Sequence, residues 1–214
     1  PLTRQSEKTT AMKMTSPDIQ AIREQVSQAL IEDLGGELNA DNDITANLIN
    51  KEVTASATII TREPCVICGV AWVNQAFALI DESVSVTWHV KDGDHVEADT
   101  VLVSLSGSAR AILTAERTAL NFLQTLSGSA TVTASYTKYL AGTNTKILDT
   151  RKTLPGLRYA QKYAVRCGGG QNHRVGLFDA YLIKENHIFS CGGIHNAISR
   201  AKTNMPGKTV EAEV

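Results

Sequence analysis

The stretch from Leu148 to His187, LDTRKTLPGLRYAQKYAVRCGGGQNHRVGLFDAYLIKENH, sets the fold expected for the second half of the chain. It lies in a series of short strand-like runs, TKILD, AYLIK and TVEAEV, that alternate with helical segments at 156–167 and 194–204. Strands that alternate with helices of ten or more residues predict parallel strands joined by right-handed crossovers. The second half is therefore expected to form part of an α/β barrel.

The same stretch concentrates positive charge in a chain whose formal net charge is only −1. Between positions 146 and 174 the sequence has only one acid, Asp149. It has seven cations there, namely Lys146, Arg151, Lys152, Arg158, Lys162, Arg166 and Arg174. A local excess of cations in a neutral protein predicts a site for a small polyanion. For Lys162 and Arg166, a solvated basic helix face remains an equal alternative.

The charged residues directly follow the apolar runs, which is where α/β barrels carry their functional groups. Asp149–Lys152 follow the first run, Lys184–His187 follow the second, and Glu211 and Glu213 alternate in the last. Alternating residues of a strand point to one face. We therefore expect cations and carboxylates from three strands to meet at one mouth of the barrel.

The residue types indicate how such a site would bind its ligand. Arginine binds carboxylates and phosphates through two parallel hydrogen bonds, whereas lysine acts as a compact point charge. Arg151, Arg174 and Arg117 therefore suit carboxylates, and Lys152 and Lys184 suit phosphates. Glycines at 168–170 could let backbone amides approach a ligand, although glycine also ends ordinary helices. The chain contains no P-loop, dinucleotide fingerprint, HExxH motif or catalytic triad pattern.

The first half has a different pattern. Residues 18–34 are expected to form an amphipathic helix, with Ser16 as N-cap and Pro17 in the first turn. Short β-branched runs between 54 and 106 predict an antiparallel sheet, interrupted by a helix at 71–80 and a KDGD turn at 91–94. A helix at 110–126 follows and is expected to continue, past Ser127 and Gly128, into a second helix that ends near Leu140.

Composition limits the possible classes of protein. With 43% apolar and 20% charged residues, the 214-residue chain can bury a core and is not a disordered chain. It has neither the roughly 20 apolar residues of a membrane span nor a secretory signal, so a cytoplasmic location is expected. Cys65 and Cys68 form a CxxC within a strand-like run, for which a buried strand is the interpretation and metal binding the alternative.

At these motifs the sequence resembles the quinolinate phosphoribosyltransferase family, also called nicotinate-nucleotide pyrophosphorylase (carboxylating). The resemblance covers nearly the whole chain. It is carried by ERTALNFLQTLSG (116–128), LDTRKTLPGLR (148–158), CGGGQNHR (167–174) and LIKENH (182–187), and it extends to EDLGGELNADNDIT in the first half.

The resemblance implies an α/β fold in which an N-terminal α/β sandwich, with an antiparallel sheet, precedes an incomplete, TIM-like α/β barrel. The boundaries expected here are 1–117 for the sandwich and 118–214 for the first part of the barrel domain. It also implies an enzyme that converts quinolinate and phosphoribosyl pyrophosphate, with Mg²⁺ and no organic cofactor, to nicotinate mononucleotide, pyrophosphate and carbon dioxide. This reaction belongs to the de novo synthesis of NAD.

The resemblance also assigns residues. Thr150, Arg151, His173 and Arg174 would bind quinolinate, and Arg117 would reach into the site of the partner subunit in a homodimer. The catalytic residues would be Lys152, Lys184 and Glu213, which also contact substrate. Glu213 would bind the ribose hydroxyls, directly or through the Mg²⁺ that accompanies phosphoribosyl pyrophosphate, because no protein cluster is expected to bind the metal directly.

The family continues for several strands beyond the position of Val214. We therefore expect the chain to be part of a longer protein and, as an isolated piece, to bind quinolinate weakly and to turn over little substrate.

Two alternatives remain. The first is the related phosphoribosyltransferase-like protein found with molybdate transport systems. The second, from another class, is a lipoyl or biotinyl carrier, because residues 88–107 resemble half of its hairpin, although the modifiable lysine at a tight turn is missing. Binding to nucleic acid or to a membrane is not expected, since no aromatic platforms accompany the cations.

Overall fold

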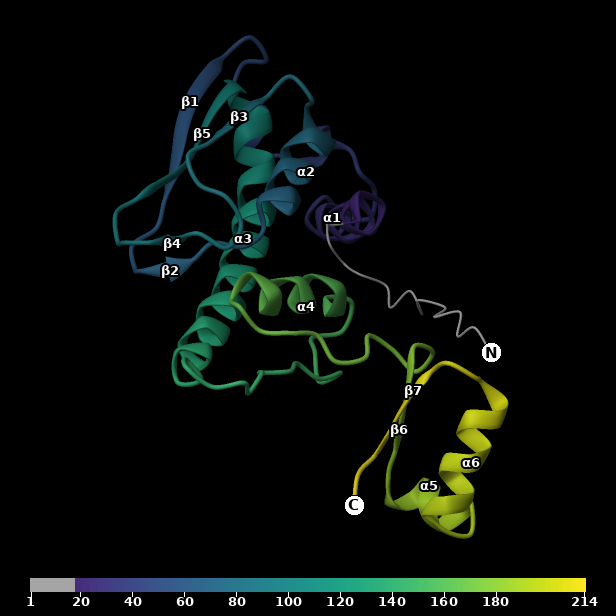
Figure 1. Cartoon of the computed structure of the whole chain (residues 1–214). Helices are drawn as coiled ribbons and strands as arrows, with labels where there is room; N and C mark the ends of the chain where they lie inside the picture. The colour runs from purple at the N-terminus through teal and green to yellow at the C-terminus, as the bar shows by residue number, and fades with distance from the viewer. Residues whose placement is uncertain (1–17) are drawn as a thin grey trace, which may run out of the picture. The chain divides into compact units, whose positions relative to one another are not determined.

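A computed structural model describes residues 18–214 of the chain. These residues form two compact units, of which one spans residues 18–172 and the other includes His173–Val214. Figure 1 shows the helices and strands of each unit. The larger unit contains most of the hydrophobic core, and the smaller one has a separate core of its own.

The larger unit begins with α1 (Ile19–Asp33), which confirms the helix expected at 18–34. Its apolar residues Ile22, Val26 and Leu30 recur every four positions and are completely buried. The N-cap is Asp18, whose side-chain oxygen accepts hydrogen bonds from the amides of Gln20 and Ala21. The helix is thus capped by Asp18 and not by the predicted Ser16. Ser16 and Pro17 lie outside the described residues. A carboxylate at this position also interacts favourably with the positive end of the helix dipole.

An antiparallel sheet follows α1, as predicted. Its strands β1 (Thr54–Ile60), β5 (Val101–Ser108) and β3 (Ser85–Trp88) are ordered β1-β5-β3. In β1 exposed and partly buried residues alternate, so that one face of the strand packs on the core. A second, two-stranded sheet pairs β2 (Cys65–Val66) with β4 (His95–Val96). The KDGD turn leads from β3 to β4 and thus connects the two sheets.

Helix α3 (Ala109–Lys138) is the central element of the larger unit and is unbroken over 30 residues. It packs against α2 (Val70–Ile80) and against the sheet (Figure 1). The predicted division at Ser127 and Gly128 is therefore wrong. The Ser127 hydroxyl accepts a hydrogen bond from the Cys68 amide and donates one to the Cys68 carbonyl, so it fastens the helix to the β2–α2 connection. These contacts and the burial of Leu126 and Ala130 outweigh the roughly 1 kcal/mol that a helical glycine costs.

Helix α4 (Arg158–Cys167) confirms the helix expected at 156–167 and packs on α3. The strand predicted at TKILD is wrong, because Leu148 forms only an isolated parallel bridge with Gln171. Two hydrogen bonds, from the Asp149 amide to the Gln171 carbonyl and from the Gln171 amide to the Ile147 carbonyl, make up this pairing. The segment is extended but too briefly paired to be a strand.

In the smaller unit, β6 (Ala180–Ile183) and β7 (Thr209–Ala212) are parallel, as predicted. Helices α5 (Glu185–Ser190) and α6 (Ile194–Asn204) connect them, and α6 packs beside the strand pair (Figure 1). Ile183, Ala197 and Ala201 are the buried centre of this small core. Helix α5 was not expected from the sequence. The fold is thus mixed α/β, with two antiparallel sheets and one parallel strand pair, and residues 18–214 contain no closed barrel.

Candidate functional site

One short segment, which leads from the Leu148–Gln171 bridge toward α4, holds the predicted anion-binding residues Thr150, Arg151 and Lys152. The Thr150 hydroxyl accepts a hydrogen bond from the Lys152 amide at 3.0 Å, which bends the segment into a tight turn. Lys152 is exposed, whereas the Arg151 side chain is partly buried. The Arg151 Nε is buried and has no hydrogen-bond partner within residues 18–214. A buried donor without a partner is costly, so this atom is suited to an external acceptor.

Lys162 is the residue whose environment the sequence left most open. It lies in the middle of α4 and its side chain is completely buried, so it does not belong to a solvated helix face. Its ammonium forms an ion pair with the Asp149 carboxylate. The side-chain amide of Asn172 donates to the same carboxylate and, at 2.8 Å, to the Lys162 carbonyl. The one signal in the sequence was Asp149 itself, the single acid among seven cations.

The glycines at 168–170 serve a structural purpose in place of the predicted approach to a ligand. Their three amides donate to the carbonyls of Ala164, Arg166 and Val165, which completes the C-terminus of α4. A β-carbon on Gly168 would lie 2.3 Å from the Ala130 carbonyl oxygen on α3. The triplet is thus needed for helix packing, and its amides are already in use.

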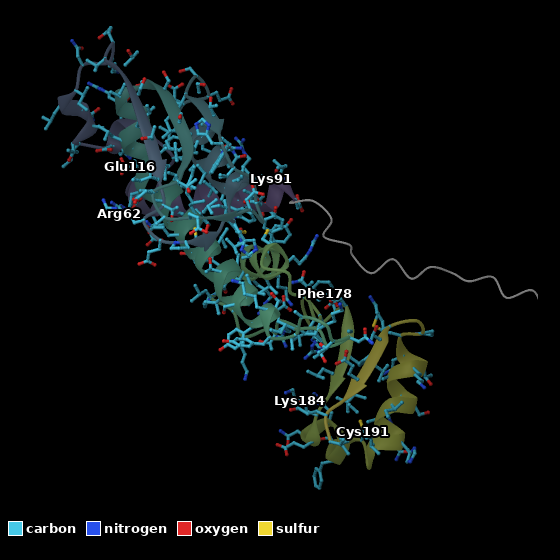
Figure 2. All side chains as sticks on the ribbon, turned by 60° about the vertical axis from the view of Figure 1, so that its left-hand side comes forward. Arg62, Lys91, Glu116, Phe178, Lys184 and Cys191 are labelled. Carbon is cyan, nitrogen blue, oxygen red and sulfur yellow. The ribbon has the colours of Figure 1, made fainter. Side chains whose placement is uncertain are left out.

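In the smaller unit, Lys184 and Glu213 lie at the ends of the neighbouring strands β6 and β7. Their Nζ and Oε2 atoms are 2.8 Å apart, and about half of each side chain is exposed (Figure 2 labels Lys184). The Glu213 amide donates to the Ile183 carbonyl at 2.8 Å, which extends the strand pairing to this point. Lys184 and Glu213 thus meet at the carboxyl ends of these two strands, as expected. Residues 149–152 follow no strand and belong to the other unit, so the meeting of three strands at one mouth stays a prediction.

His173 and Arg174 are also held within the smaller unit. The His173 Nε2 lies 2.8 Å from the Glu211 carboxylate on β7. Arg174 donates to the Ala180 carbonyl at 3.3 Å, and its side chain is half-buried. The His187 Nδ1 accepts a hydrogen bond from the Lys184 amide at the start of α5, which gives this histidine a capping role. Glu211 was noted in the sequence only as a neighbour of Glu213, and the structure shows it as the partner of His173.

Arg117 lies on α3 and is exposed. No hydrogen bond or ion pair of its guanidinium is found among the described residues. Its side chain is therefore available for an external anion.

A small cluster of titratable groups links α4 to the first half of the chain. The Tyr163 hydroxyl donates to Asp92 at 2.9 Å, and burial together with the Asp92 charge raises the pKa of Tyr163 above its usual range. Cys68 is fully buried and interacts with Cys167, which raises the pKa of the Cys68 thiol, as does its burial. The same interaction lowers the pKa of Cys167. Tyr163 thus stays a neutral donor, and Cys167 is the more readily ionised thiol.

Residues 18–214 contain no group of three or more His, Cys, Asp or Glu side chains that could hold a metal ion. Cys65 contacts the Thr61 hydroxyl at 3.6 Å, and Cys68 is packed in the core. The interpretation of the CxxC segment as a buried strand is confirmed for Cys65 and Val66, which form β2. No helix in the described part of the chain is long and apolar enough to cross a membrane.

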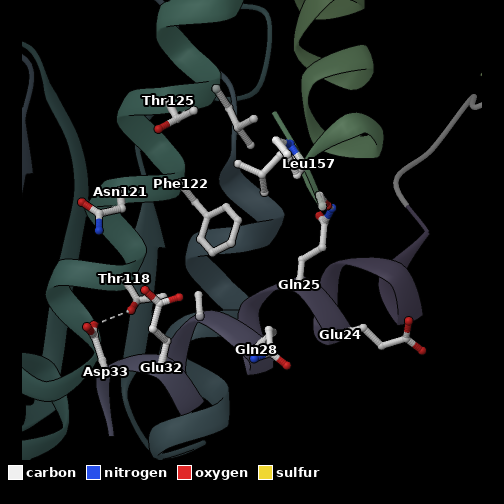
Figure 3. Close-up of a pocket in the computed structure, with 14 residues that line it drawn as sticks. Glu24, Gln25, Gln28, Glu32, Asp33, Thr118, Asn121, Phe122, Thr125 and Leu157 are labelled. Carbon is white, nitrogen blue, oxygen red and sulfur yellow. Dashed lines mark hydrogen bonds between the residues drawn. The ribbon is translucent and has the colours of Figure 1, made fainter. Parts of the chain in front are cut away.

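A pocket of about 550 Å³ lies between α1 and α3, and residues 155–157 close one side of it (Figure 3). The Phe122 ring lies in this pocket, whose lining includes the acids Glu24, Glu32 and Asp33 and no basic side chain. Asp33 accepts a hydrogen bond from the Thr118 hydroxyl at 3.0 Å. An acidic rim repels anions, so this pocket is not the site expected for a dicarboxylate.

Comparison with known proteins identifies two consecutive domains of one family in the chain. Residues 43–127 match the family described as quinolinate phosphoribosyl transferase, N-terminal domain, and residues 129–214 match its C-terminal domain. A probable nicotinate-nucleotide pyrophosphorylase [carboxylating] from Bacillus subtilis is 40% identical over 193 residues, which are 90% of this chain and 65% of the relative. The corresponding protein from Mycobacterium leprae is 40% identical, over 92% of this chain and 69% of its own length.

A solved structure, that of the nicotinate-nucleotide pyrophosphorylase from Francisella tularensis, superposes with a TM-score of 0.87 at 48% identity. The match covers 93% of this chain and 69% of that one. The chain thus spans about two thirds of the length of these relatives. The fold and these residues define the class of protein, which is an α/β protein with cations and carboxylates at strand ends. Within that class, the chain belongs to the quinolinate phosphoribosyl transferase family.

Proposed function

We propose that the protein transfers the phosphoribosyl group of phosphoribosyl pyrophosphate to quinolinate, with loss of carbon dioxide. The products would be nicotinate mononucleotide, pyrophosphate and carbon dioxide, within NAD biosynthesis. The observation that carries this proposal is the Lys184–Glu213 pair, which joins a cation to a carboxylate at two neighbouring strand ends in a chain of this family. The names of the relatives describe the same reaction.

The proposed roles follow from the chemistry of the side chains. Quinolinate carries two carboxylates, for which Thr150, Arg151, His173 and Arg174 supply hydrogen bonds and charge. Lys152 and Lys184 would contact substrate and the phosphates of the donor as point charges. The partly buried guanidinium of Arg151, with its unpartnered Nε, is already ordered before the ligand arrives. Less side-chain entropy is then lost on binding.

Glu213 would act on the sugar. Departure of pyrophosphate leaves positive charge on the ribose, and a carboxylate fixed nearby stabilises it. Glu213 is held through its amide to β6 and through its side chain to Lys184, so its position is set in advance. Loss of carbon dioxide then leaves electron density on the ring carbon beside the nitrogen, which fixed cations stabilise. Most of the rate would come from positioning and charge.

Mg²⁺ would enter with phosphoribosyl pyrophosphate as part of the substrate. The half-exposed Glu213 carboxylate fits this ion, because Mg²⁺ is usually held by one or two carboxylates together with substrate phosphates. No organic cofactor is part of the proposal.

The assembly, domain and compartment assignments belong to the same proposal. A homodimer would place the exposed Arg117 of one subunit in the site of the other, and the free guanidinium on α3 supports this. The α/β sandwich would span 1–117 and the first part of a TIM-like barrel 118–214, whereas the two family matches meet at residues 127–129. We propose a cytoplasmic location, with no nucleic-acid or membrane partner, although plant relatives are named as chloroplastic or mitochondrial.

The test is product formation. The protein in its full-length form is incubated with quinolinate, phosphoribosyl pyrophosphate and Mg²⁺, and nicotinate mononucleotide is measured by chromatography. Arg151→Ala should lower kcat/KM by about 100-fold, because it removes a charged hydrogen bond to a carboxylate. Titration with quinolinate and with other small dicarboxylates separates this function from that of the molybdate-associated relatives. Product formation that Arg151→Ala leaves unchanged would contradict the assignment of the site.

A further inference from the structure

We propose that Lys162 is a positioning residue for the substrate-binding segment Thr150–Lys152. Its buried ammonium would hold Asp149, and thereby the turn that presents Arg151 to a carboxylate of quinolinate. The inference rests on the proposed function and extends it to a cation that does not itself touch the substrate. It concerns the larger unit, residues 18–172, alone.

Three side chains of α4 hold the segment from Asp149 to Leu154. At its start, the Lys162 ammonium pairs with the Asp149 carboxylate. At its end, the Arg158 Nε donates to the Thr153 hydroxyl at 3.2 Å, and the Gln161 side-chain oxygen accepts from the Leu154 amide at 2.8 Å. Thr150, Arg151 and Lys152 lie between these two anchors. The segment is therefore fixed at both ends to one helix.

The Asp149 carboxylate also joins two stretches of chain. One oxygen contacts Lys162 and the other accepts from the Asn172 side chain, which in turn reaches the Lys162 carbonyl. The backbone pairing of Leu148 with Gln171 lies next to this cluster. The three side chains thus connect α4, the residue before Thr150 and the residue before His173 in a single hydrogen-bonded group.

Stability alone is a poor explanation for this arrangement. The side chains of Lys162 and Asp149 are 0% and 8% exposed, so both charges have lost most of their hydration. A buried ion pair often contributes no more to stability than well-packed apolar side chains would, but its directional contacts fix a geometry. The residues that follow Asp149 are the ones that need a fixed geometry, because Arg151 must meet a planar carboxylate with correct alignment.

The experiment compares Lys162→Met with Lys146→Met. Both variants remove one lysine charge and keep a similar apolar body, but Lys146 is exposed and three residues before Asp149. A third variant, Lys162→Met with Asp149→Asn, also removes the buried negative charge of Asp149, which the first variant leaves without the Lys162 ammonium. Thermal unfolding, steady-state kinetics for each substrate, and amide hydrogen exchange of residues 150–154 are measured for all of them.

We expect Lys162→Met to raise the KM for quinolinate by about 10- to 100-fold, with a much smaller change in the KM for phosphoribosyl pyrophosphate. Amides of residues 150–154 should exchange at least about tenfold faster, because one anchor of the segment is lost. The double variant should regain much of the lost thermal stability but not the quinolinate KM. Lys146→Met should match the wild type in every measurement.

A purely structural role predicts a different outcome. If the double variant regains the quinolinate KM together with its stability, or if exchange at residues 150–154 does not change in Lys162→Met, the positioning role is wrong. The proposed function fails separately, when the wild-type protein forms no nicotinate mononucleotide. In that case the hydrogen exchange of residues 150–154 still decides whether Lys162 fixes the segment.

Discussion

The Lys184 ammonium lies 2.8 Å from the Glu213 carboxylate, across the carboxyl ends of the parallel strands β6 and β7. Each residue directly follows its strand, Lys184 after β6 and Glu213 after β7, and the pairing of the two strands brings them together. Because both side chains are about half exposed, the ion pair contributes only about 0–1 kcal/mol to stability. Its importance is therefore expected in catalysis and not in folding.

Replacing Glu213 by glutamine tests this expectation. The variant keeps the shape of the side chain but removes the charge that would stabilise the developing positive ribose, so kcat should fall by about 100- to 1000-fold. The melting temperature should stay within about 2 °C of the wild type, because the pair is exposed. Steady-state kinetics and calorimetry measure both. Glu97→Gln, a change at an exposed carboxylate of the other unit, is the control, and equal activity of the two variants would contradict the role of Glu213.

Gly168 and Gly128 provide a matched pair of glycine-to-alanine substitutions. A β-carbon at Gly168 would lie 2.3 Å from the Ala130 carbonyl oxygen, whereas one at Gly128 meets no atom within 4 Å. Gly168→Ala should lower the free energy of unfolding by about 1–3 kcal/mol or more, since α4 must move away from α3. Gly128→Ala should raise it by up to about 1 kcal/mol, because alanine favours the helix. Denaturant titration measures both, and a neutral Gly168→Ala would show that this packing is loose.

Asp92 joins two parts of the larger unit and should be important for its stability. One carboxylate oxygen accepts from the amides of Gly69 and Val70 at the start of α2, and the other accepts from Tyr163. Asp92→Ala removes a helix cap and leaves the tyrosine hydroxyl without its acceptor, at a cost of about 2–4 kcal/mol. Asp94→Ala, in the same turn, removes a local contact to the Lys91 amide and should cost far less. Equal losses in denaturant titrations would contradict the role of Asp92.

The two interacting thiols should differ in reactivity. Hydrogen bonding with Cys68 lowers the pKa of Cys167, whereas the same interaction and burial raise the pKa of Cys68. Thiolate is the reactive form, so at pH 7 iodoacetamide should modify Cys167 before Cys68. As the pH rises, the rate at Cys167 should level off at a lower pH than it would for an unperturbed cysteine, because the pKa of this thiol is lowered.

Peptide mass spectrometry follows the modification of each cysteine over time. Cys167→Ser is the control, and it should leave Cys68 unreactive in the folded protein because that side chain is fully buried. Faster modification of Cys68 than of Cys167 would reverse the assigned order.

The sequence by itself determined helices α1, α2, α4 and α6, the antiparallel sheet, the parallel β6–β7 pair and the positions of Lys184 and Glu213 at strand ends, because these depend on periodicity and on neighbours along the chain. It missed helix α5 and divided α3 wrongly. It also carried the family resemblance. Three features depended on the tertiary structure. Whether TKILD becomes a strand depends on a partner strand, and at Leu148 only one bridge is formed. The need for glycine at 168 depends on how closely α4 approaches α3.

The third feature is the role of Lys162. A lysine in a short helix has the same local pattern whether it faces water or the core, because burial is decided by what packs against the helix. Here Asp149, from outside α4, pairs with the ammonium, and Asn172 holds the Asp149 carboxylate and the Lys162 carbonyl. The sequence showed seven cations and one acid, and only the folded chain shows which cation that acid holds.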